Sequence, residues 1–222
     1  MKTDSELQRD VMNQLKWEPI IRAAEIGVGV KIGVVTLSGY VDSYNKKWAA
    51  ERAARRVSGV KGVAEDIKVS LSGSYKRTDE DIVGSATNAL NWNAWIPRDR
   101  VKVMAQNGWI TLSGDVDWYH QKEEAAKVVR DLIGVLGVNN FITIKPPVPT
   151  VKAFEVKNDI QEALRRNARL RLDAEKIQVE ISGNQVILSG SVSSCADYDK
   201  AGYAAYCAPG VSEVENNLRV TG

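Results

Sequence analysis

The sequence predicts an α+β protein of three tandem αββαβ modules, each a three-stranded mixed sheet with two helices on one face. The first observation is an internal repeat. The string at residues 35–41 (VTLSGYV) returns at 110–116 (ITLSGDV) and again at 186–192 (VILSGSV), 75 and then 76 residues further on. A Gly-Val-x-x-Val sequence returns in the same register, at 59–63, 134–138 and 210–214. We therefore divide the chain into module 1 (residues 3–71), module 2 (78–145) and module 3 (152–221).

Each module is expected to begin with an amphipathic helix, because apolar residues recur every four positions. These residues are Leu7, Val11 and Leu15 in module 1, Ile82, Ala86 and Leu90 in module 2, and Val156, Ile160 and Leu164 in module 3. A strand with alternating apolar residues follows, as at Ile26, Val28 and Val30. A glycine-containing turn, such as Asn107-Gly108, then leads into the second strand.

The second strand, the second helix and the third strand complete the module. The second strand places Val35, Leu37, Gly39 and Val41 of module 1 on one face. The second helix has apolar residues at i, i+3, i+4 and i+7 in every copy: Ala50, Ala53, Ala54 and Val57; Ala125, Val128, Val129 and Leu132; Ala201, Ala204, Ala205 and Ala208. Because a strand–helix–strand unit forms a right-handed crossover between parallel strands, the third strand should lie parallel to the second.

Composition excludes several classes of protein. Hydrophobic residues make up 44% and charged residues 26%, with a net charge of +2, so we expect a globular protein without a nucleic-acid partner. No apolar run approaches the ~18 residues that a membrane-spanning helix needs. The charged N-terminus does not resemble a signal peptide. We expect a cytoplasmic protein for the sequence as written, and a periplasmic one if an export signal had been removed.

The Leu-Ser-Gly-x-Val strand, the alanine-rich second helix and the closing Gly-Val-x-x-Val, in this αββαβ order, resemble the BON domain, named after bacterial osmotically inducible and nodulation proteins. The resemblance covers nearly the whole chain. It implies a bacterial protein of osmotic and envelope stress, whose domains bind phospholipid membranes. Some family members bind a small ligand or a potassium ion through backbone groups, and such binding leaves no side-chain motif.

Patterns typical of enzymes, metal sites and cofactor sites are absent from the sequence. The chain has one histidine, His120, which we expect to lie solvated at the start of a helix. Cys195 and Cys207 are 12 residues apart in one predicted helix, too far for a disulfide, and are expected to be free thiols. We therefore predict a protein that is not an enzyme and that has no cofactor and no metal.

Six repeated glycines are expected to serve the backbone geometry. Gly39, Gly114 and Gly190 end the second strands, and Gly59, Gly134 and Gly210 follow the second helices, where a left-handed residue is common. Close approach of a ligand to the strand glycines is the alternative interpretation.

Two groups of residues are candidates for contact with a membrane or a ligand. The first is aromatic and surrounds the junction of the second strand with the second helix: Tyr40, Tyr44, Trp48, Trp118 and Tyr119. Helix capping and packing at the core edge are the alternative roles. The second is basic: Arg165, Arg166, Arg169 and Arg171, otherwise a solvated face. Trp92 and Trp95 are expected to cover the rim of the core.

Two apolar residues of module 2 are predicted to point away from the helices. Met104 and Phe141 lie at outward positions of neighbouring strands, where module 1 has Gly29 and Asp66. We predict that this face contacts another module or subunit, with membrane or ligand contact and simple exposure as the alternatives.

Peripheral association with anionic phospholipid is the function that the sequence favours. The alternatives are a soluble protein that senses a small ligand or a potassium-like monovalent cation, and a structural module that self-assembles.

Overall fold

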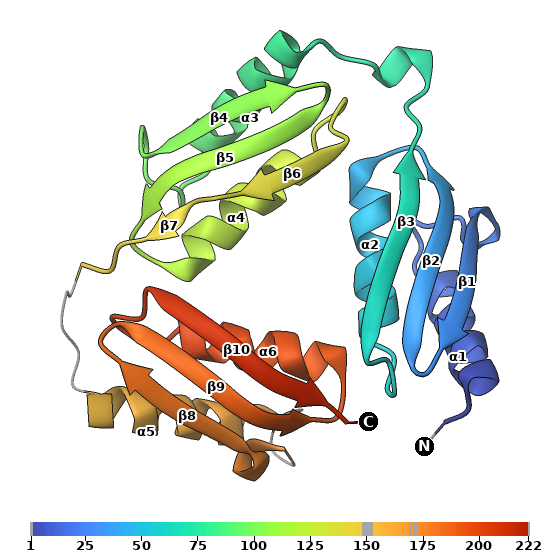
Figure 1. The fold of residues 1–222 in the computed structure, drawn as a ribbon. Coiled ribbons are helices and arrows are strands. Elements are labelled where there is room, and N and C mark those ends of the chain that lie inside the picture. The colour runs from blue at the N-terminus through green and yellow to red at the C-terminus, as the bar shows by residue number, and fades with distance from the viewer. Residues whose placement is uncertain (1, 148–152, 169, 171–172, 222) are drawn as a thin grey trace. The chain divides into compact units, whose positions relative to one another are not determined.

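The computed structural model describes residues 2–147, 153–168, 170 and 173–221. It confirms the α+β fold class, with three successive αββαβ modules that are described one at a time below (Figure 1). The proline-rich connector is described only at Pro146 and Pro147. Val148 and Pro149 lie outside the described residues.

The elements follow the predicted order in every module. Module 1 contains α1 (Asp4–Lys16), β1 (Ile26–Lys31), β2 (Val34–Val41), α2 (Tyr44–Arg55) and β3 (Gly62–Val69). Module 2 contains α3 (Asp79–Trp92), β4 (Val101–Gln106), β5 (Trp109–Val116), α4 (Tyr119–Arg130), β6 (Gly137–Asn140) and β7 (Thr143–Ile144). Module 3 contains α5 (Ala153–Arg166), β8 (Ile177–Ser182), β9 (Gln185–Val192), α6 (Cys195–Tyr206) and β10 (Glu213–Val220). Three short 3₁₀ turns, η1 (Ala23–Glu25), η2 (Gly73–Tyr75) and η3 (Ala174–Lys176), complete the described elements.

The second strand occupies the centre of each sheet. Its first neighbour is antiparallel, with Ile26 opposite Gly39 in module 1, Val101 opposite Gly114 in module 2 and Ile177 opposite Gly190 in module 3. The third strand is parallel to it in modules 2 and 3, as the crossover rule requires. Both sheets are therefore mixed, and β3 likewise neighbours β2 in module 1.

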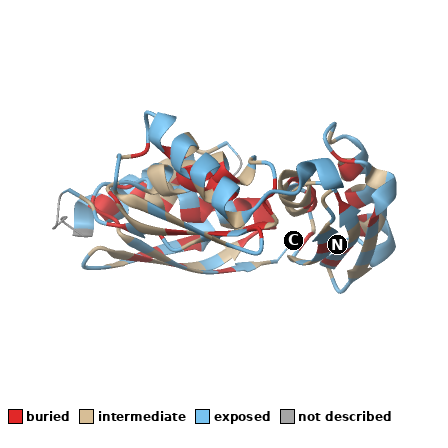
Figure 2. Ribbon diagram, turned by 90° about the horizontal axis from the view of Figure 1, so that it is seen from above, coloured by how far each residue is buried: buried red, intermediate tan, exposed pale blue. Residues whose placement is uncertain are grey.

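The core of each module lies between its two helices and one face of its sheet, where Figure 2 shows the buried residues in red. The predicted first-helix stripes are buried, from Leu7, Val11 and Leu15 in α1 to Val156, Ile160 and Leu164 in α5. In module 3 these α5 residues pack with Val179 and Leu188 of the sheet and with alanines of α6. Small alanines let the second helix lie close to the sheet, which explains why this helix is alanine-rich.

The third strand of module 2 differs from the single strand that the repeat predicts. β6 ends at Asn140 and β7 begins at Thr143, and both pair with β5. The Asn140 side chain points toward the helices, where its amide donates to the carbonyl of Lys122 (2.9 Å) and its oxygen accepts from the N–H of Ile142 (3.2 Å). In module 3 the equivalent Asn216 makes the same two hydrogen bonds within an unbroken β10, so these bonds do not account for the interruption at residues 141–142.

The glycines that end the second strands have a geometrical cause. Gly39, Gly114 and Gly190 have φ values of +130°, +119° and +114°. A Cβ atom at any of them would overlap the carbonyl oxygen that precedes the first strand, which belongs to Glu25, Arg100 or Lys176. Only glycine permits this approach together with a positive φ.

A carboxylate at the start of the first helix holds the hairpin turn in two modules. Asp4 accepts hydrogen bonds from the N–H groups of Ile32 (2.8 Å) and Gly33 (3.0 Å). Asp79 accepts the equivalent bonds from Asn107 and Gly108, both 2.8 Å. The bonds from Ile32 and Gly33, with the nearby charge of Lys61, lower the pKa of Asp4.

The close approach at the strand glycines predicts a large loss of stability when Gly114 is replaced by alanine. We expect Gly114→Ala to lower the free energy of unfolding by at least about 2 kcal/mol, because the new methyl group meets a backbone oxygen. Gly84→Ala is the matched control. Gly84 lies within α3 with open space around it, so that substitution should stabilise the protein by about 0.5–1 kcal/mol. Equal effects of the two substitutions in denaturant unfolding would contradict this account.

The clamp at Asp4 predicts a stability that depends on pH. The pKa of Asp4 is lower in the folded protein than its ordinary value of 3.8, so its contribution is present above that pH and is lost as the pH falls through the folded pKa. The melting temperature of Asp4→Ala should therefore be lower than wild type at about pH 7, and the difference should shrink below about pH 4. Ser5→Ala, in the same turn, should give no such trend. A difference that stays constant with pH would show that the charge of Asp4 does not stabilise the turn.

Candidate functional site

Exposed apolar side chains lie at and just after the end of the first helix, at the same place in modules 1 and 2. Trp17 is 83% exposed and Trp92 is 89% exposed, and the two residues occupy equivalent positions in the repeat. Three residues further on, Ile20 and Trp95 are also exposed. We call these four residues the helix-end residues.

The exposure of Trp92 and Trp95 corrects the prediction that they cover the rim of the core. The buried stripe of α3 ends at Leu90. Trp92 lies two residues later, which on a helix is a rotation of about 200° away from the core. The buried Ile96 closes the rim instead, as Ile21 does in module 1.

The helix-end loop of module 2 meets the beginning of α4. The rings of Trp95 and His120 contact edge to face, with their centroids 5.8 Å apart. Gln121 caps this end of the helix, because its side-chain oxygen accepts from the N–H groups of Asp117 (3.0 Å) and Trp118 (3.1 Å). The cap fixes the exposed Trp118 beside a half-buried Tyr119. Loop and helix start therefore form one aromatic surface, and His120 is exposed as predicted but also contacts Trp95.

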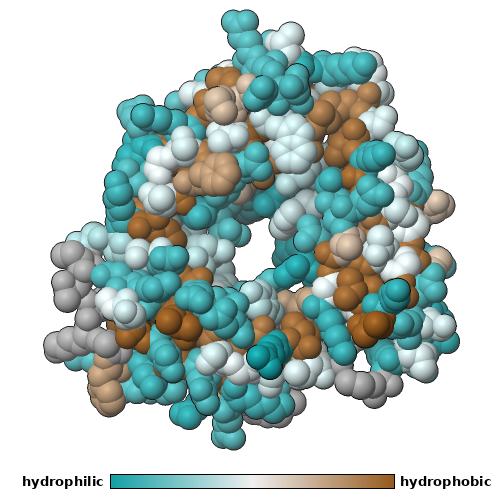
Figure 3. Space-filling view, viewed as in Figure 1, coloured by the Kyte–Doolittle hydropathy of each residue, from teal (hydrophilic) through white to brown (hydrophobic). Residues whose placement is uncertain are grey.

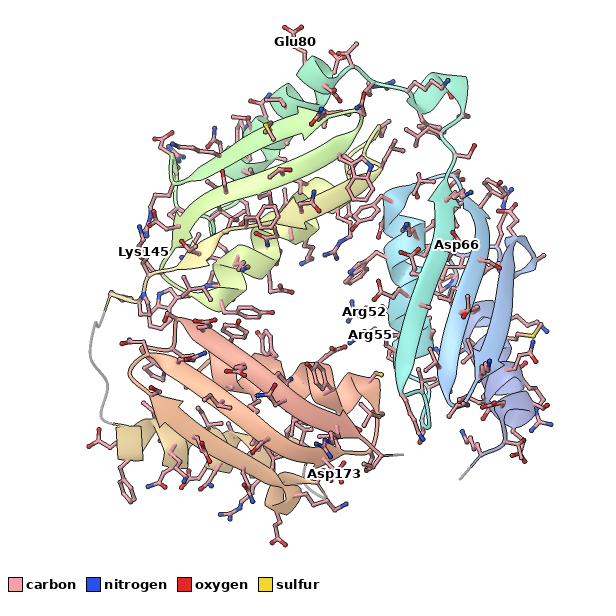
Figure 4. The ribbon with its side chains drawn as sticks, viewed as in Figure 1. Arg52, Arg55, Asp66, Glu80, Lys145 and Asp173 are labelled. Atoms are coloured by element: carbon pink, nitrogen blue, oxygen red, sulfur yellow. The ribbon has the colours of Figure 1, made fainter. Side chains whose placement is uncertain are left out.

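Ion pairs hold the same end of module 2 in place. Arg100 donates to Asp115 (2.6 Å) and to Asp117 (2.8 Å). Lys145, labelled in Figure 4, lies 3.4 Å from Asp115. The hydrogen bonds from Arg100 are the main cause that lowers the pKa of Asp115, and the same bonds raise the pKa of Arg100. The network joins the start of β4 to the end of β5 and to the residue after β7. Its charges cancel, so it supports the aromatic surface and adds no net charge to it.

The aromatic candidates of module 1 are only partly accessible. Tyr40 is exposed at the end of β2, while Tyr44, the first residue of α2, is half-buried. Trp48 is half-buried as well, and the guanidinium carbon of Arg52 lies 4.9 Å from its ring centroid. This cation–π contact engages the ring within its own helix. The most accessible aromatic residue of the module is Trp17, which sequence reasoning missed.

Module 3 has arginines where the other modules have helix-end residues. Arg165 and Arg166 are exposed in the last turn of α5, and Arg166 pairs with Glu162 (3.1 Å). Arg169 and Arg171 lie outside the described residues. The buried carboxylate of Asp173 accepts from the backbone and hydroxyl of Ser193 and from Lys176 (Figure 4). Burial acts to raise the pKa of Asp173, but these bonds outweigh it and the pKa is lowered.

Two free cysteines flank α6: Cys195 is its first residue and Cys207 directly follows its end. Cys195 is buried and Cys207 is exposed. Desolvation raises the pKa of both thiols.

The outward face of the module 2 sheet carries apolar side chains among hydrophilic ones (Figure 3). Met104 is 57% exposed and Phe141 is 67% exposed. Trp109 joins them on this face and lies over Gly137, where a Cβ atom would overlap its ring. The contact of Met104 and Phe141 with another module or subunit stays a prediction.

The remaining glycine candidates have conformations that suit their positions. Gly59, Gly134 and Gly210 follow the second helices with φ values of +95°, +95° and +79°. Such a left-handed residue is a common way for a helix to end.

Metal binding and membrane spanning find no support in the described residues. Within residues 2–147, 153–168, 170 and 173–221, no group of three or more His, Cys, Asp or Glu side chains is arranged to hold a metal ion. Every helix in the same part of the chain is too short or too polar to cross a membrane.

Comparison with known proteins identifies the family. The model of the BON domain matches residues 3–70, 78–146 and 154–222. Osmotically-inducible protein Y of Escherichia coli (strain K12) is 30% identical over 146 residues, which cover 64% of this chain and 73% of that protein. Among solved structures, CdsD, a structural protein of the type III secretion system of Chlamydia trachomatis, is 14% identical over 96% of this chain and 91% of its own. The TM-score of this match is 0.25. A second CdsD structure, of the C-terminal domain, has a TM-score of 0.26, with 15% identity and full coverage of both chains. Scores this low support no conclusion about this chain. Three family matches over nearly the whole chain place this protein in the BON-domain family.

Proposed function

We propose that this protein is a stress-associated binding protein, not an enzyme, that associates peripherally with anionic phospholipid membranes through its tandem modules. The observation that carries the proposal is the exposure of the helix-end residues at equivalent places in modules 1 and 2. The similarity to osmotically-inducible protein Y supports a role in the response to osmotic stress.

Exposed tryptophan is costly in water and favourable at the boundary between lipid headgroups and acyl chains. A tryptophan offers a large apolar ring and an N–H that finds a partner among headgroups. If Trp17 and Trp92 contributed to core packing, their side chains would be buried, yet both are almost fully exposed. The paired residues Ile20 and Trp95 enlarge the apolar surface at each end. Such a surface suits a lipid interface.

Cations lie near the helix-end residues, in loops that also contain Glu18, which pairs with Arg56, and the exposed Asp99. Lys16 and Arg98 are exposed, and neither forms an ion pair with another described residue. In module 3 the exposed Arg165 and Arg166 occupy the equivalent end of the first helix. These cations favour anionic headgroups, and their contribution weakens as salt screens it.

Tandem modules increase the strength of such contacts. One aromatic pair with one or two cations binds a membrane weakly, because no acyl chain or spanning helix adds to it. Once one module is bound, a second on a short connector acts at a high effective concentration. The proposal applies to either face of a membrane, so it holds for a cytoplasmic and for a periplasmic protein.

Self-assembly is a second candidate function, and a specific observation favours it. Met104, Trp109 and Phe141 expose apolar side chains on one sheet face of module 2. The equivalent residues are Gly29, Val34 and Asp66 in module 1 and Glu180, Gln185 and Asn217 in module 3, so this apolar face is specific to module 2. If this face mediates self-assembly, replacing Met104 and Phe141 by aspartate should lower the molecular mass of the assembled protein in solution. Binding of a small ligand or a monovalent cation stays a prediction.

The membrane proposal is tested by co-sedimentation with vesicles of phosphatidylglycerol and of phosphatidylcholine at two salt concentrations. We expect wild type to bind only the anionic vesicles, and less at high salt. Trp17→Gln combined with Trp92→Gln should weaken binding by at least about tenfold, because two apolar rings lose their lipid contact. Tyr75→Gln, which removes an exposed aromatic residue from η2, should leave binding unchanged.

Two results would reject the proposal. One is the absence of wild-type binding to either kind of vesicle. The other is equal binding by wild type and the double tryptophan variant at both salt concentrations.

A further inference from the structure

The tip of the first hairpin in module 1 carries an isoleucine in an unfavourable conformation. Ile32 has a φ of +54° and is 73% exposed. A β-branched side chain in the left-handed region is strained, and this one gains no burial in return. Strain of this kind that the packing does not explain points to a function of the side chain.

The other two modules relieve the strain at the same position. Module 2 has Asn107 with a φ of +50°, and module 3 has Gly183 with a φ of +59°. Asparagine and glycine are the residues that this turn favours. The fold therefore accepts a relaxed residue at this position, and only module 1 has an exposed apolar one.

Two lysines lie beside the hairpin tip in module 1, and neither has a lysine counterpart in modules 2 and 3. Lys31 precedes Ile32, and the side chain of Lys61 packs beside Gly33. Both lysines are exposed, and neither forms an ion pair with any described residue. Module 2 has Gln106 and Leu136 at these positions, and module 3 has Ser182 and Ser212.

The tip is held rigidly. Asp4 accepts from the N–H groups of Ile32 and Gly33, and the N–H of Lys61 donates to the carbonyl of Gly33 (2.9 Å). A rigid apolar apex between two cations loses little conformational freedom when it enters an interface.

We propose that the hairpin tip of module 1, with Ile32 between Lys31 and Lys61, is a second lipid-contact site that inserts into the interface of an anionic bilayer. This inference rests on the proposed membrane function and adds a contact to it. Lys31 and Lys61 outnumber the Asp4 carboxylate that holds the turn, so the net charge of the tip is positive and matches anionic headgroups. Its apex matches the apolar layer beneath them.

One side of α1 borders the hairpin of module 1, and Trp17, nine positions after Gln8, lies about 180° round the helix from it. The Gln8 side chain donates to the carbonyl of Val28 in β1 (2.7 Å), so this side of α1 lies along an edge strand. Met12, one turn later on the same side, is exposed. α1 is about 20 Å long, with Ile32 near its start and Ile20 beyond its end.

The first test compares Ile32→Asn with wild type. Asparagine suits the turn, so the variant should melt at a higher temperature than wild type. It should nevertheless bind phosphatidylglycerol vesicles about fivefold more weakly, because the apolar apex is lost. A gain in stability with a loss of binding cannot come from misfolding. Lys31→Gln combined with Lys61→Gln should weaken binding mainly at low salt.

The second test places an environment-sensitive fluorophore on cysteine at the tip. Ile32→Cys is labelled in a Cys207→Ser background, which removes the exposed native thiol. Asn107→Cys is the matched control, because it occupies the same turn position with the same Asp clamp. Anionic vesicles should brighten the label at position 32 and leave the label at position 107 unchanged.

The outcomes separate this inference from the proposed function. If wild type and Ile32→Asn bind vesicles equally and the label at position 32 does not brighten, the tip is not a lipid site, but the proposed membrane function stands. A tip that docks on a protein would give this result. Wild type that binds no vesicle overturns both. Weaker binding by Ile32→Asn together with a brighter label at 32 supports the tip.

Discussion

Each module depends on a glycine at the end of its second strand, where no side chain fits. At Gly39, Gly114 and Gly190 the backbone approaches the carbonyl that precedes the first strand too closely for a Cβ atom. This approach aligns the start of the first strand with the end of the second. The loop after the first helix and the start of the second helix therefore lie at the same end of the module. In module 2 the contact of Trp95 with His120 is the direct consequence.

Three copies of one scaffold carry three different surfaces at that end. Module 1 presents Trp17 and Ile20, and module 2 presents Trp92 and Trp95. Module 3 has arginines in the last turn of its first helix instead. The core positions stay apolar throughout, because packing fixes them, whereas exposed positions are free to differ. Differences between equivalent exposed positions are therefore the best guide to what each module contacts.

The sequence was sufficient for the fold and insufficient for the site. The repeat predicted the order of helices and strands in every module because core residues recur in register, and the strand glycines marked a backbone requirement. The break in the third strand of module 2 was not predictable from the repeat, because module 3 has an asparagine with the same contacts, Asn216, and keeps one continuous strand. Trp92 was placed on the core rim because the predicted helix was not followed past Leu90, where two more residues turn the side chain outward. Comparing Trp17 with Trp92 across the repeat would have revealed a shared exposed position.

Quenching of tryptophan fluorescence by brominated phosphatidylglycerol tests the central claim, that the helix-end residues enter an anionic membrane. The chain has six tryptophans, three of which are helix-end residues. The account predicts that vesicles with brominated acyl chains quench wild-type fluorescence. It also predicts that replacing Trp17, Trp92 and Trp95 by leucine removes most of that quenching, although Trp48, Trp109 and Trp118 remain. Quenching that is absent in wild type, or unchanged by the triple replacement, would contradict the claim.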